Sequence, residues 1–324
     1  MNVTFAGSPD RVESQLVPEA GYELDTFTIS GFPRRPGLGL LRALVRAARA
    51  PFACSRILAS RRPHVVLGAG GYVAGPMVLA ARLRGVPAAL TEADAHLGLA
   101  NRLAAPFARR VFLAYPVPGR ESTKYSVVGR PIPRTHLGGD GGSARVRFGL
   151  PAEGPVLAFF GGLAGAQVLN EFAAETYGAR GPAVLHLAGE RDFQTVRAKV
   201  TRPDYVLLTT TNDFGDALAV ADLAVSRAGG TVWELAAAGT PSILVPYPHA
   251  TADHQALNAR YFETGGGAVV VQQDDLAEVP TLVDELLGDP GRLQVMSEAM
   301  RALAKPNAAE VVADELVRMA QERR

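Results

Sequence analysis

The stretch between residues 221 and 258 constrains the fold of this chain more than any other part of it. It reads ADLAVSRAGGTVWELAAAGTPSILVPYPHATADHQALN. Residues 223–226 are an apolar run of strand length, and the glycines within 227–230 mark a turn. Residues 231–238 are Ala-rich and end at a glycine and a proline, and 242–245 are a second apolar run. The stretch therefore predicts a strand, a glycine turn, a helix and a strand, the repeating unit of a parallel α/β sheet.

The glycine turn and the helix after it have the outline of an anion site. Free backbone N–H groups at a helix N-terminus and the helix dipole both attract phosphate. Glu234 lies one turn into the helix, where its carboxylate is placed to accept hydrogen bonds from a ribose diol. Polar residues that suit sugar hydroxyls cluster after the second strand: His249, Thr251, Asp253, His254, Gln255 and Asn258. The alternative is an ordinary βαβ unit whose glycines serve only the turn.

These motifs resemble a known family. SRAGGTVWELAAAG followed by VPYPHATADHQALNA is similar to the donor-binding signature of the MurG family. Those enzymes move N-acetylglucosamine from UDP-GlcNAc to lipid-linked muramyl-pentapeptide in peptidoglycan synthesis. The resemblance implies an α/β fold of the GT-B type, two doubly wound Rossmann-like domains facing a cleft. It also implies that the donor is bound by Arg227, Gly229, Gly230, Thr231, Glu234, His249, His254 and Gln255.

Two glycine-rich loops and a short linker-side motif extend the resemblance. Residues 161–166 (GGLAGA) resemble the family's GGSQGA loop, which touches the donor's phosphates. Leu163 and Ala164 replace the polar Ser-Gln pair, so binding here would use backbone N–H groups of Gly161, Gly162 and Gly165. Residues 68–76 resemble the family's GGYVSGP loop, and 129–131 resemble its Gly-Asn-Pro motif with Arg130 in place of Asn.

The tetrad Thr-Glu-Ala-Asp at residues 91–94 replaces the family's His-Glu-Gln-Asn. It follows the predicted strand 87–90, at the carboxyl end where ligands gather in open α/β sheets. Glu92 matches the family, and the next helix retains a matching asparagine. The resemblance implies an acceptor-side cleft lined by Gly70, Gly71, Tyr72, Asp94 and Asn101.

The start of the chain departs from the family. The family's first unit is a strand, a Gly-Gly-Thr-Gly-Gly-His loop and a helix, whereas this sequence begins at what resembles the second strand. We therefore expect a truncated first domain that lacks its first βα unit. The loop histidine is absent with it, which leaves the general base unassigned and Glu92 and His96 as candidates.

Charge divides the chain of 324 residues into two halves. Residues 1–135 hold 18 Lys and Arg against 8 Asp and Glu, a net charge of +10, and the remainder holds 15 against 24, a net of −9. The glycine-rich residues 137–143 lie at the reversal and predict an interdomain linker. We expect an acceptor-facing and membrane-facing domain at 1–136, a donor domain at 144–305 and a terminal helix at 306–324 that crosses back to the first.

Residues 38–60 predict a helix with a break or kink at Pro51. Four arginines decorate it: Arg42, Arg46, Arg49 and Arg56. It is either a core-packing helix with a solvated basic face or an amphipathic surface for anionic lipid headgroups.

The chain has no apolar run of about 18–20 residues and no signal peptide, and its single cysteine fits a reducing compartment. We expect a cytoplasmic protein that is peripheral on the inner face of the cell membrane.

Other classes of ligand lack a signal. The six histidines are scattered and lack the spacing of a metal site, so no metal or cofactor is expected. Basic residues do not cluster with aromatic ones as they do on a nucleic-acid-binding surface, so no nucleic acid is expected. The expected partners are UDP-GlcNAc, a lipid-linked pyrophosphoryl acceptor and an anionic membrane surface. Two alternatives stay open: a GT-B enzyme with another lipid or natural-product acceptor, and a catalytically inactive nucleotide-sugar-binding protein.

Overall fold

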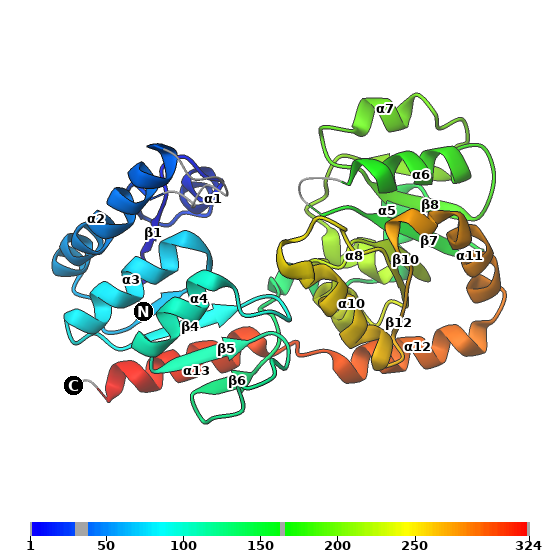
Figure 1. Cartoon of the computed structure of the whole chain (residues 1–324). Helices are drawn as coiled ribbons and strands as arrows, with labels where there is room; N and C mark the ends of the chain where they lie inside the picture. Colours follow the sequence, from blue (N-terminus) through cyan, green and yellow to red (C-terminus); the bar gives the residue numbers. More distant parts are fainter. Residues whose placement is uncertain (1, 30–37, 163–165, 323–324) are drawn as a thin grey trace. The chain divides into compact units, whose positions relative to one another are not determined.

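The chain folds as two compact α/β units in a computed structural model that describes residues 2–29, 38–162 and 166–322 (Figure 1). The first unit combines Met1–Val128 with Glu310–Arg324, and the second is Gly129–Ala309. Each unit contains its own parallel sheet and its own hydrophobic core, as a domain of this size does.

The second unit is built on a parallel sheet whose strand order is β12-β11-β10-β7-β8-β9. The direction of winding reverses between β7 and β10, which lie side by side, with Ser226 opposite Phe160. Such a reversal is where open α/β sheets bind ligands, at the carboxyl ends of the strands. The strands are β7 (Val156–Phe160), β8 (Ala183–Leu187), β9 (Tyr205–Leu208), β10 (Leu223–Ser226), β11 (Ser242–Leu244) and β12 (Ala268–Val270).

Helices cover both faces of this sheet, because the central strands are apolar on both sides. Leu157 and Phe159 point into one core with Leu169 and Val283, while Phe160 on the other face is also buried. Strands buried on both faces read as continuous apolar runs, which is why the sequence predicts β10 at its observed bounds. The helices are α5 (Gly141–Phe148), α6 (Gln167–Tyr177), α7 (Phe193–Arg197), α8 (Phe214–Ala219), α9 (Thr231–Ala238), α10 (His254–Thr264), α11 (Val279–Leu287) and α12 (Pro290–Leu303).

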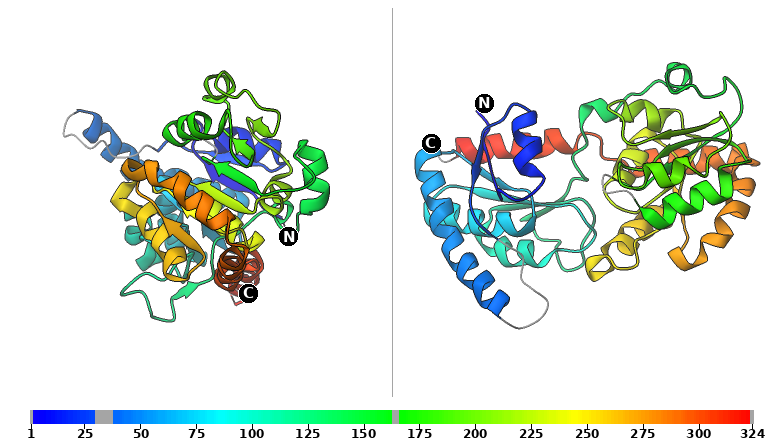
Figure 2. Two further views of the ribbon diagram at one scale, coloured as in Figure 1. Left: turned by 90° about the vertical axis from the view of Figure 1, so that its right-hand side faces the viewer. Right: turned by 90° about the horizontal axis from the view of Figure 1, so that it is seen from above.

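The first unit has a parallel sheet in the order β3-β4-β5-β6, with β1 and β2 paired in parallel as a separate ribbon. Figure 2 shows these elements from two further directions. The strands are β1 (Phe5–Gly7), β2 (Leu24–Thr26), β3 (Val66–Gly68), β4 (Ala88–Glu92), β5 (Arg110–Leu113) and β6 (Tyr125–Val127). The helices are α1 (Glu13–Glu19), α2 (Leu38–Arg61), α3 (Gly71–Leu83), α4 (Leu99–Ala104) and α13 (Ala308–Gln321).

Helix α2 is continuous through Pro51, so the predicted break is not present. Its inner face packs on the first unit through Ala50, Cys54 and Leu58. Burial raises the pKa of the Cys54 thiol to about 12, so this cysteine is an inert part of the core.

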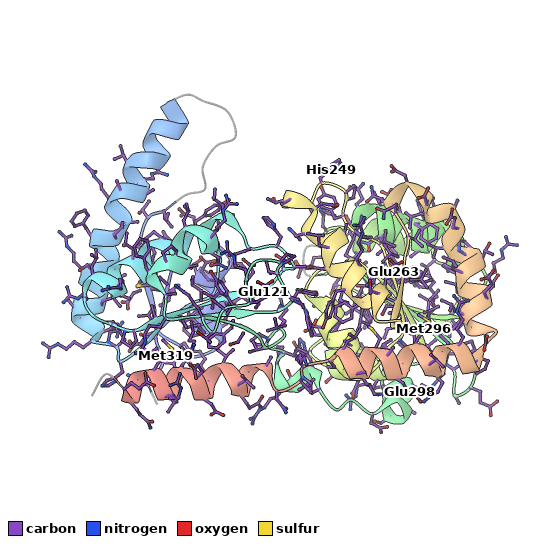
Figure 3. All side chains as sticks on the ribbon, turned by 60° about the horizontal axis from the view of Figure 1, so that its bottom comes forward. Glu121, His249, Glu263, Met296, Glu298 and Met319 are labelled. Carbon is purple, nitrogen blue, oxygen red and sulfur yellow. The ribbon has the colours of Figure 1, made fainter. Side chains whose placement is uncertain are left out.

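The C-terminal helix α13 belongs to the core of the first unit. Met319 and its neighbours on one face of the helix pack against Ala89 and Phe112 of the sheet (Figure 3). At the rim, the Arg110 Nε donates to the Glu315 Oε1 at 2.6 Å. Hydrogen bonds from Arg318 and then from Arg110 lower the pKa of Glu315 to about 2, which keeps this carboxylate ionised.

The glycine-rich residues 137–143 are not a linker, and this prediction was wrong. The division between the units falls between Val128 and Gly129. The Asp140 carboxylate accepts from the N–H groups of Gly142 and Ser143 and so caps α5. A Cβ at residue 139 would lie 2.1 Å from the Gly215 carbonyl oxygen, so this glycine serves close packing rather than flexibility.

Candidate functional site

The two predicted glycine turns of the second unit lie next to each other at the reversal of the sheet. The Arg227 N–H and the Ser226 hydroxyl both donate to the Phe160 carbonyl oxygen, at 3.2 and 3.1 Å. Gly161 and Gly162 follow that carbonyl, and Gly162 has a φ of 78° with open space where a Cβ would lie. Gly165 lies outside the described residues.

Helix α9 begins where an anion site was predicted. Gly230 occupies the N-cap position and no side chain among the described residues caps the first turn, which starts at Thr231. No described atom lies within 4 Å of the position a Cβ would take at Gly229. The Val232 and Trp233 N–H groups already donate to the carbonyl oxygens of Gly229 and Gly230, at 3.4 and 3.1 Å. Among the described residues the N–H groups of Gly230 and Thr231 have no such acceptor, so these two are available to an anionic ligand. Gly239 ends the helix in the left-handed conformation, with a φ of 75°, as the sequence predicts.

The Arg227 side chain supports the turn from inside the fold. Its guanidinium donates to the carbonyl oxygens of Val245 and Pro246 at 3.2 and 3.1 Å and to the Gln273 Oε1 at 2.6 Å. The residue is 8% exposed, and burial lowers the pKa of the guanidinium. The expected contact between Arg227 and the phosphates can therefore come from its turn, whereas its side chain is committed to the protein.

A second arginine, which the sequence analysis did not assign to the donor site, lies at the start of α9. A Cβ at Gly230 would come within 2.5 Å of the Arg130 Cζ, so the guanidinium rests against the bare backbone of this glycine. Arg130 is half-buried and makes no hydrogen bond or ion pair with the residues that the structure describes. The sequence shows Arg130 as a departure from the family motif, but only the fold brings it to α9.

The predicted ribose acceptor has a partner that sequence reasoning missed. The His136 Nδ1 lies 2.6 Å from the Glu234 Oε1, and the two side chains are 26% and 17% exposed. The His136 ring also packs edge-on against Phe214, with ring centroids 5.1 Å apart. The carboxylate is thus held at the first turn of α9 and remains partly open to solvent.

The second polar cluster surrounds the start of α10. The Gln255 Oε1 accepts from the Tyr247 N–H, and the His254 Nδ1 donates to the Thr251 carbonyl oxygen, both at 2.9 Å. His249, which Figure 3 labels, packs edge-on against the Tyr247 ring with ring centroids 5.5 Å apart. The Asn258 Nδ2 donates to the Ala228 carbonyl oxygen at 3.1 Å, which ties α10 to the glycine turn. The cluster and the turn are therefore parts of one region.

In the first unit, Glu92 stabilises a loop instead of pointing freely into a site. Its oxygens accept from the N–H groups of Ala93, Asp94 and Gly98 and from the Asn101 Nδ2, at 2.9 to 3.4 Å. Glu92 is only 9% exposed. A carboxylate with these donors is already satisfied, so the geometry does not favour it as a general base.

The other predicted acceptor-side residues gather around the same loop. The Asn101 Nδ2 also donates to the Thr91 carbonyl oxygen at 2.9 Å, and a Cβ at Gly70 would lie 3.9 Å from that nitrogen. Gly70 and Gly71 have φ values of 90° and 68°, which let α3 begin directly after β3. Tyr72 is 51% exposed, and His96 lies half-buried in the loop that Glu92 holds.

Comparisons with known proteins define the class. The model of the glycosyltransferase family 28 C-terminal domain matches residues 156–312, and that of the N-terminal domain matches residues 1–113. The solved structure of Acinetobacter baumannii MurG is similar to the whole chain, with a TM-score of 0.78, 28% identity, and coverage of 98% of this chain and 91% of that one. The calicheamicin glycosyltransferase CalG4 shares the fold at 18% identity and a TM-score of 0.65, over 96% of this chain and 90% of that one. The chain is a glycosyltransferase with the GT-B fold.

Curated relatives give the particular family. A Salinibacter ruber protein is 37% identical over 98% of this chain and 88% of its own length. An Acidithiobacillus ferrooxidans protein is 40% identical over 97% of this chain and 88% of its own. Both are named UDP-N-acetylglucosamine--N-acetylmuramyl-(pentapeptide) pyrophosphoryl-undecaprenol N-acetylglucosamine transferase. The chain belongs to the MurG family.

Proposed function

We propose that this chain transfers N-acetylglucosamine from UDP-GlcNAc to lipid-linked muramyl-pentapeptide in peptidoglycan precursor synthesis. The relatives that it matches over most of their length carry the name of that reaction. The observation that supports it most is the first turn of α9, where an uncapped helix N-terminus, the Arg130 guanidinium and the Glu234 carboxylate come together. UDP-GlcNAc offers the matching groups, a diphosphate and a ribose diol.

In this reaction the acceptor hydroxyl attacks C1 of the sugar, and the bond between C1 and the diphosphate oxygen breaks with inversion. The hydroxyl proton passes to a general base, and UDP leaves with the electrons of the broken bond. The N–H groups of the α9 turn and Arg130 stabilise the negative charge that develops on the diphosphate. For the base we retain His96 as the candidate, because the Glu92 oxygens are already occupied.

The remaining donor roles follow the arrangement of the second unit. Glu234 accepts from the ribose hydroxyls, the turn at Gly229 and Thr231 binds the phosphates, and His254 and Gln255 bind sugar hydroxyls. Residues 161–162 add backbone N–H groups from the neighbouring turn.

The test is a transfer assay with purified protein, UDP-GlcNAc and a lipid-linked muramyl-pentapeptide, with release of UDP and labelled product measured together. Product formation that depends on both substrates supports the proposal. Transfer to a different acceptor alone would assign the chain to another GT-B reaction, and donor binding without turnover would identify an inactive binding protein. A Glu234→Ala variant serves as the control: because it lacks the proposed ribose acceptor, it should release less UDP and form less labelled product than the native chain.

We further propose that the chain acts at the inner face of the cell membrane. Among the described residues no helix is long and apolar enough to cross a bilayer. The outer face of α2 instead combines exposed apolar and basic side chains, among them Phe52, which is 73% exposed. Helix α3 packs on α2, and the Arg84 Nη1 at its end donates to the Ser55 hydroxyl of α2 at 3.0 Å. The last residue of α3, Leu83, is 76% exposed. Exposed apolar groups among arginines suit the headgroup region of an anionic bilayer.

A further inference from the structure

The short helix that presents His136 is held against α8 by close backbone contact. This 3₁₀ turn, Arg134–His136, follows two prolines that limit its conformations. A Cβ at Gly215 would lie 2.9 Å from the Thr135 carbonyl oxygen and 3.4 Å from the His136 Cα. Only a glycine there allows the turn to approach α8 so closely. The position of the backbone that carries His136 is therefore set by this packing and does not depend on the contacts of the His136 side chain.

The His136 ring is fixed as well. It stands edge-on against Phe214, whose ring packs in turn on Phe160 at the end of β7, with centroids 5.4 Å apart. The ring nitrogen Nδ1 then meets the Glu234 Oε1 at 2.6 Å. Because an ionised carboxylate only accepts hydrogen bonds, Nδ1 is the donor in this pair.

The contact leaves half of the carboxylate available. The second oxygen of Glu234 makes no hydrogen bond with the described residues, and the side chain is 17% exposed. Asp216, the charged residue of the neighbouring helix α8, pairs with Arg147 of α5 and not with His136 or Glu234. His136 is thus the group that sets the direction of the free Glu234 oxygen.

We propose that His136 is a positioning residue for ribose recognition: it holds the Glu234 carboxylate so that the free oxygen accepts from the ribose 2′-hydroxyl of the nucleotide. This inference rests on the proposed function, in which Glu234 binds the donor ribose. It gives the enzyme a means of preferring ribonucleotide over deoxyribonucleotide donors. A loosely held carboxylate would lose that preference, because a hydrogen bond to a mobile acceptor contributes less to binding.

The experiment measures the Kd of UDP and of 2′-deoxy-UDP by calorimetry for the native chain and for matched variants. His136→Phe keeps a ring against Phe214 but removes the donor, and His136→Asn restores an N–H near the position of Nδ1. We expect His136→Phe to weaken UDP binding about tenfold, to change 2′-deoxy-UDP binding little, and so to remove most of the discrimination. His136→Asn should recover part of it. Combined with Glu234→Ala, His136→Phe should have no further effect.

Controls separate positioning from folding. His64→Asn removes an exposed histidine in the first unit and should leave both affinities unchanged. The positioning role is wrong if His136→Phe raises the Kd of UDP and of 2′-deoxy-UDP by the same factor. It is also wrong if the Kd of UDP for His136→Phe is equal to or lower than that of the native chain. If His136→Phe does not fold, the comparison of His136→Asn with the native chain decides the same question. If the native chain binds no UDP at all, the proposed function itself fails, which these variants cannot mimic.

Discussion

At the scale of single residues, the charged side chains of the site divide into those that hold the protein together and those that face a ligand. Arg227 and Glu92 each bind several backbone groups and are at most 9% exposed. Arg130 lies against the N-terminus of α9 without a partner among the described residues. Sequence motifs cannot separate these roles, because the side chains differ only in what the fold brings near them.

The two arginines should therefore respond differently to substitution. Arg130→Leu should weaken UDP binding about tenfold and leave the melting temperature nearly unchanged, because it removes a charge that faces the ligand. Arg227→Leu should cost about 1–3 kcal/mol of stability, because it leaves the carbonyl groups of residues 245 and 246 without their donor. Calorimetry and chemical denaturation measure the two effects. Equal loss of stability in both variants would contradict the assignment of Arg227 to the protein framework and of Arg130 to the ligand.

Glu234 provides the second residue-scale prediction. Glu234→Ala should weaken UDP binding by about 1.5–3 kcal/mol, the range for a hydrogen bond to a charged group. Calorimetry measures the change, with Glu298→Ala as the control, since Glu298 is an exposed glutamate of α12 (Figure 3). Unchanged affinity for UDP would remove Glu234 from the donor site.

At the scale of elements, the second unit contains a buried polar network beside its apolar sheet. His186 of β8 is fully buried, with its Nδ1 2.8 Å from the Tyr205 hydroxyl and its Nε2 3.0 Å from the Asn170 Oδ1. Asn170 of α6 donates to the Ala188 carbonyl oxygen and to Asp192. The network joins β8, β9 and α6, and its groups have little access to water that could replace a lost bond.

This network makes stability depend on pH. Burial lowers the pKa of His186 from 6.5 to about 3, so the folded chain keeps this imidazole neutral while the unfolded chain protonates it. Between these two pH values the unfolded state binds the extra proton, and the free energy of unfolding falls as the pH falls, by up to about 1.4 kcal/mol per pH unit from this group. Denaturation of His186→Gln should show a shallower pH dependence over that window. His64→Gln, at an exposed histidine, should leave the slope as it is; an unchanged slope for His186→Gln would contradict the assignment.

At the scale of the whole molecule, the uneven charge has a structural counterpart. Residues 1–135 carry a net charge of +10, with 18 Lys and Arg against 8 Asp and Glu. On α2 the exposed residues 45, 49, 52 and 56 recur at helical spacing, alternating apolar and basic side chains. The same helix packs Ala50, Cys54 and Leu58 into the core, so its packing role and its proposed membrane role use opposite faces.

The membrane proposal predicts binding that depends on charge. Changing Arg46, Arg49 and Arg56 together to Glu should release the protein from anionic vesicles, because each arginine near such a surface contributes about 1 kcal/mol. Binding of the native chain should also fall as salt rises. Co-sedimentation with anionic and neutral vesicles measures both effects. The control makes the same charge change at exposed arginines of the second unit: Arg180, Arg197 and Arg292. Equal binding to neutral vesicles, or retention of the α2 variant, would leave the basic face as a solvated surface.

Local patterns were sufficient for much of the fold. The apolar run of β10 and the glycine that ends α9 were predicted at their observed positions, because burial on both sides of a parallel sheet and a left-handed helix end each leave a sequence signature. The composition of residues 137–143 misled, since glycines that permit close packing look the same in sequence as glycines of a linker.

The partners of the polar side chains were decided only by the tertiary structure. His136 and Glu234 are 98 residues apart, and Arg130 meets Gly230 across a similar interval. Sequence alone determined which residues can donate, accept or bind phosphate, and therefore the class of ligand. Which of them are free to do so depends on contacts between distant segments, because a hydrogen-bonding group satisfied inside the protein is no longer available to a substrate.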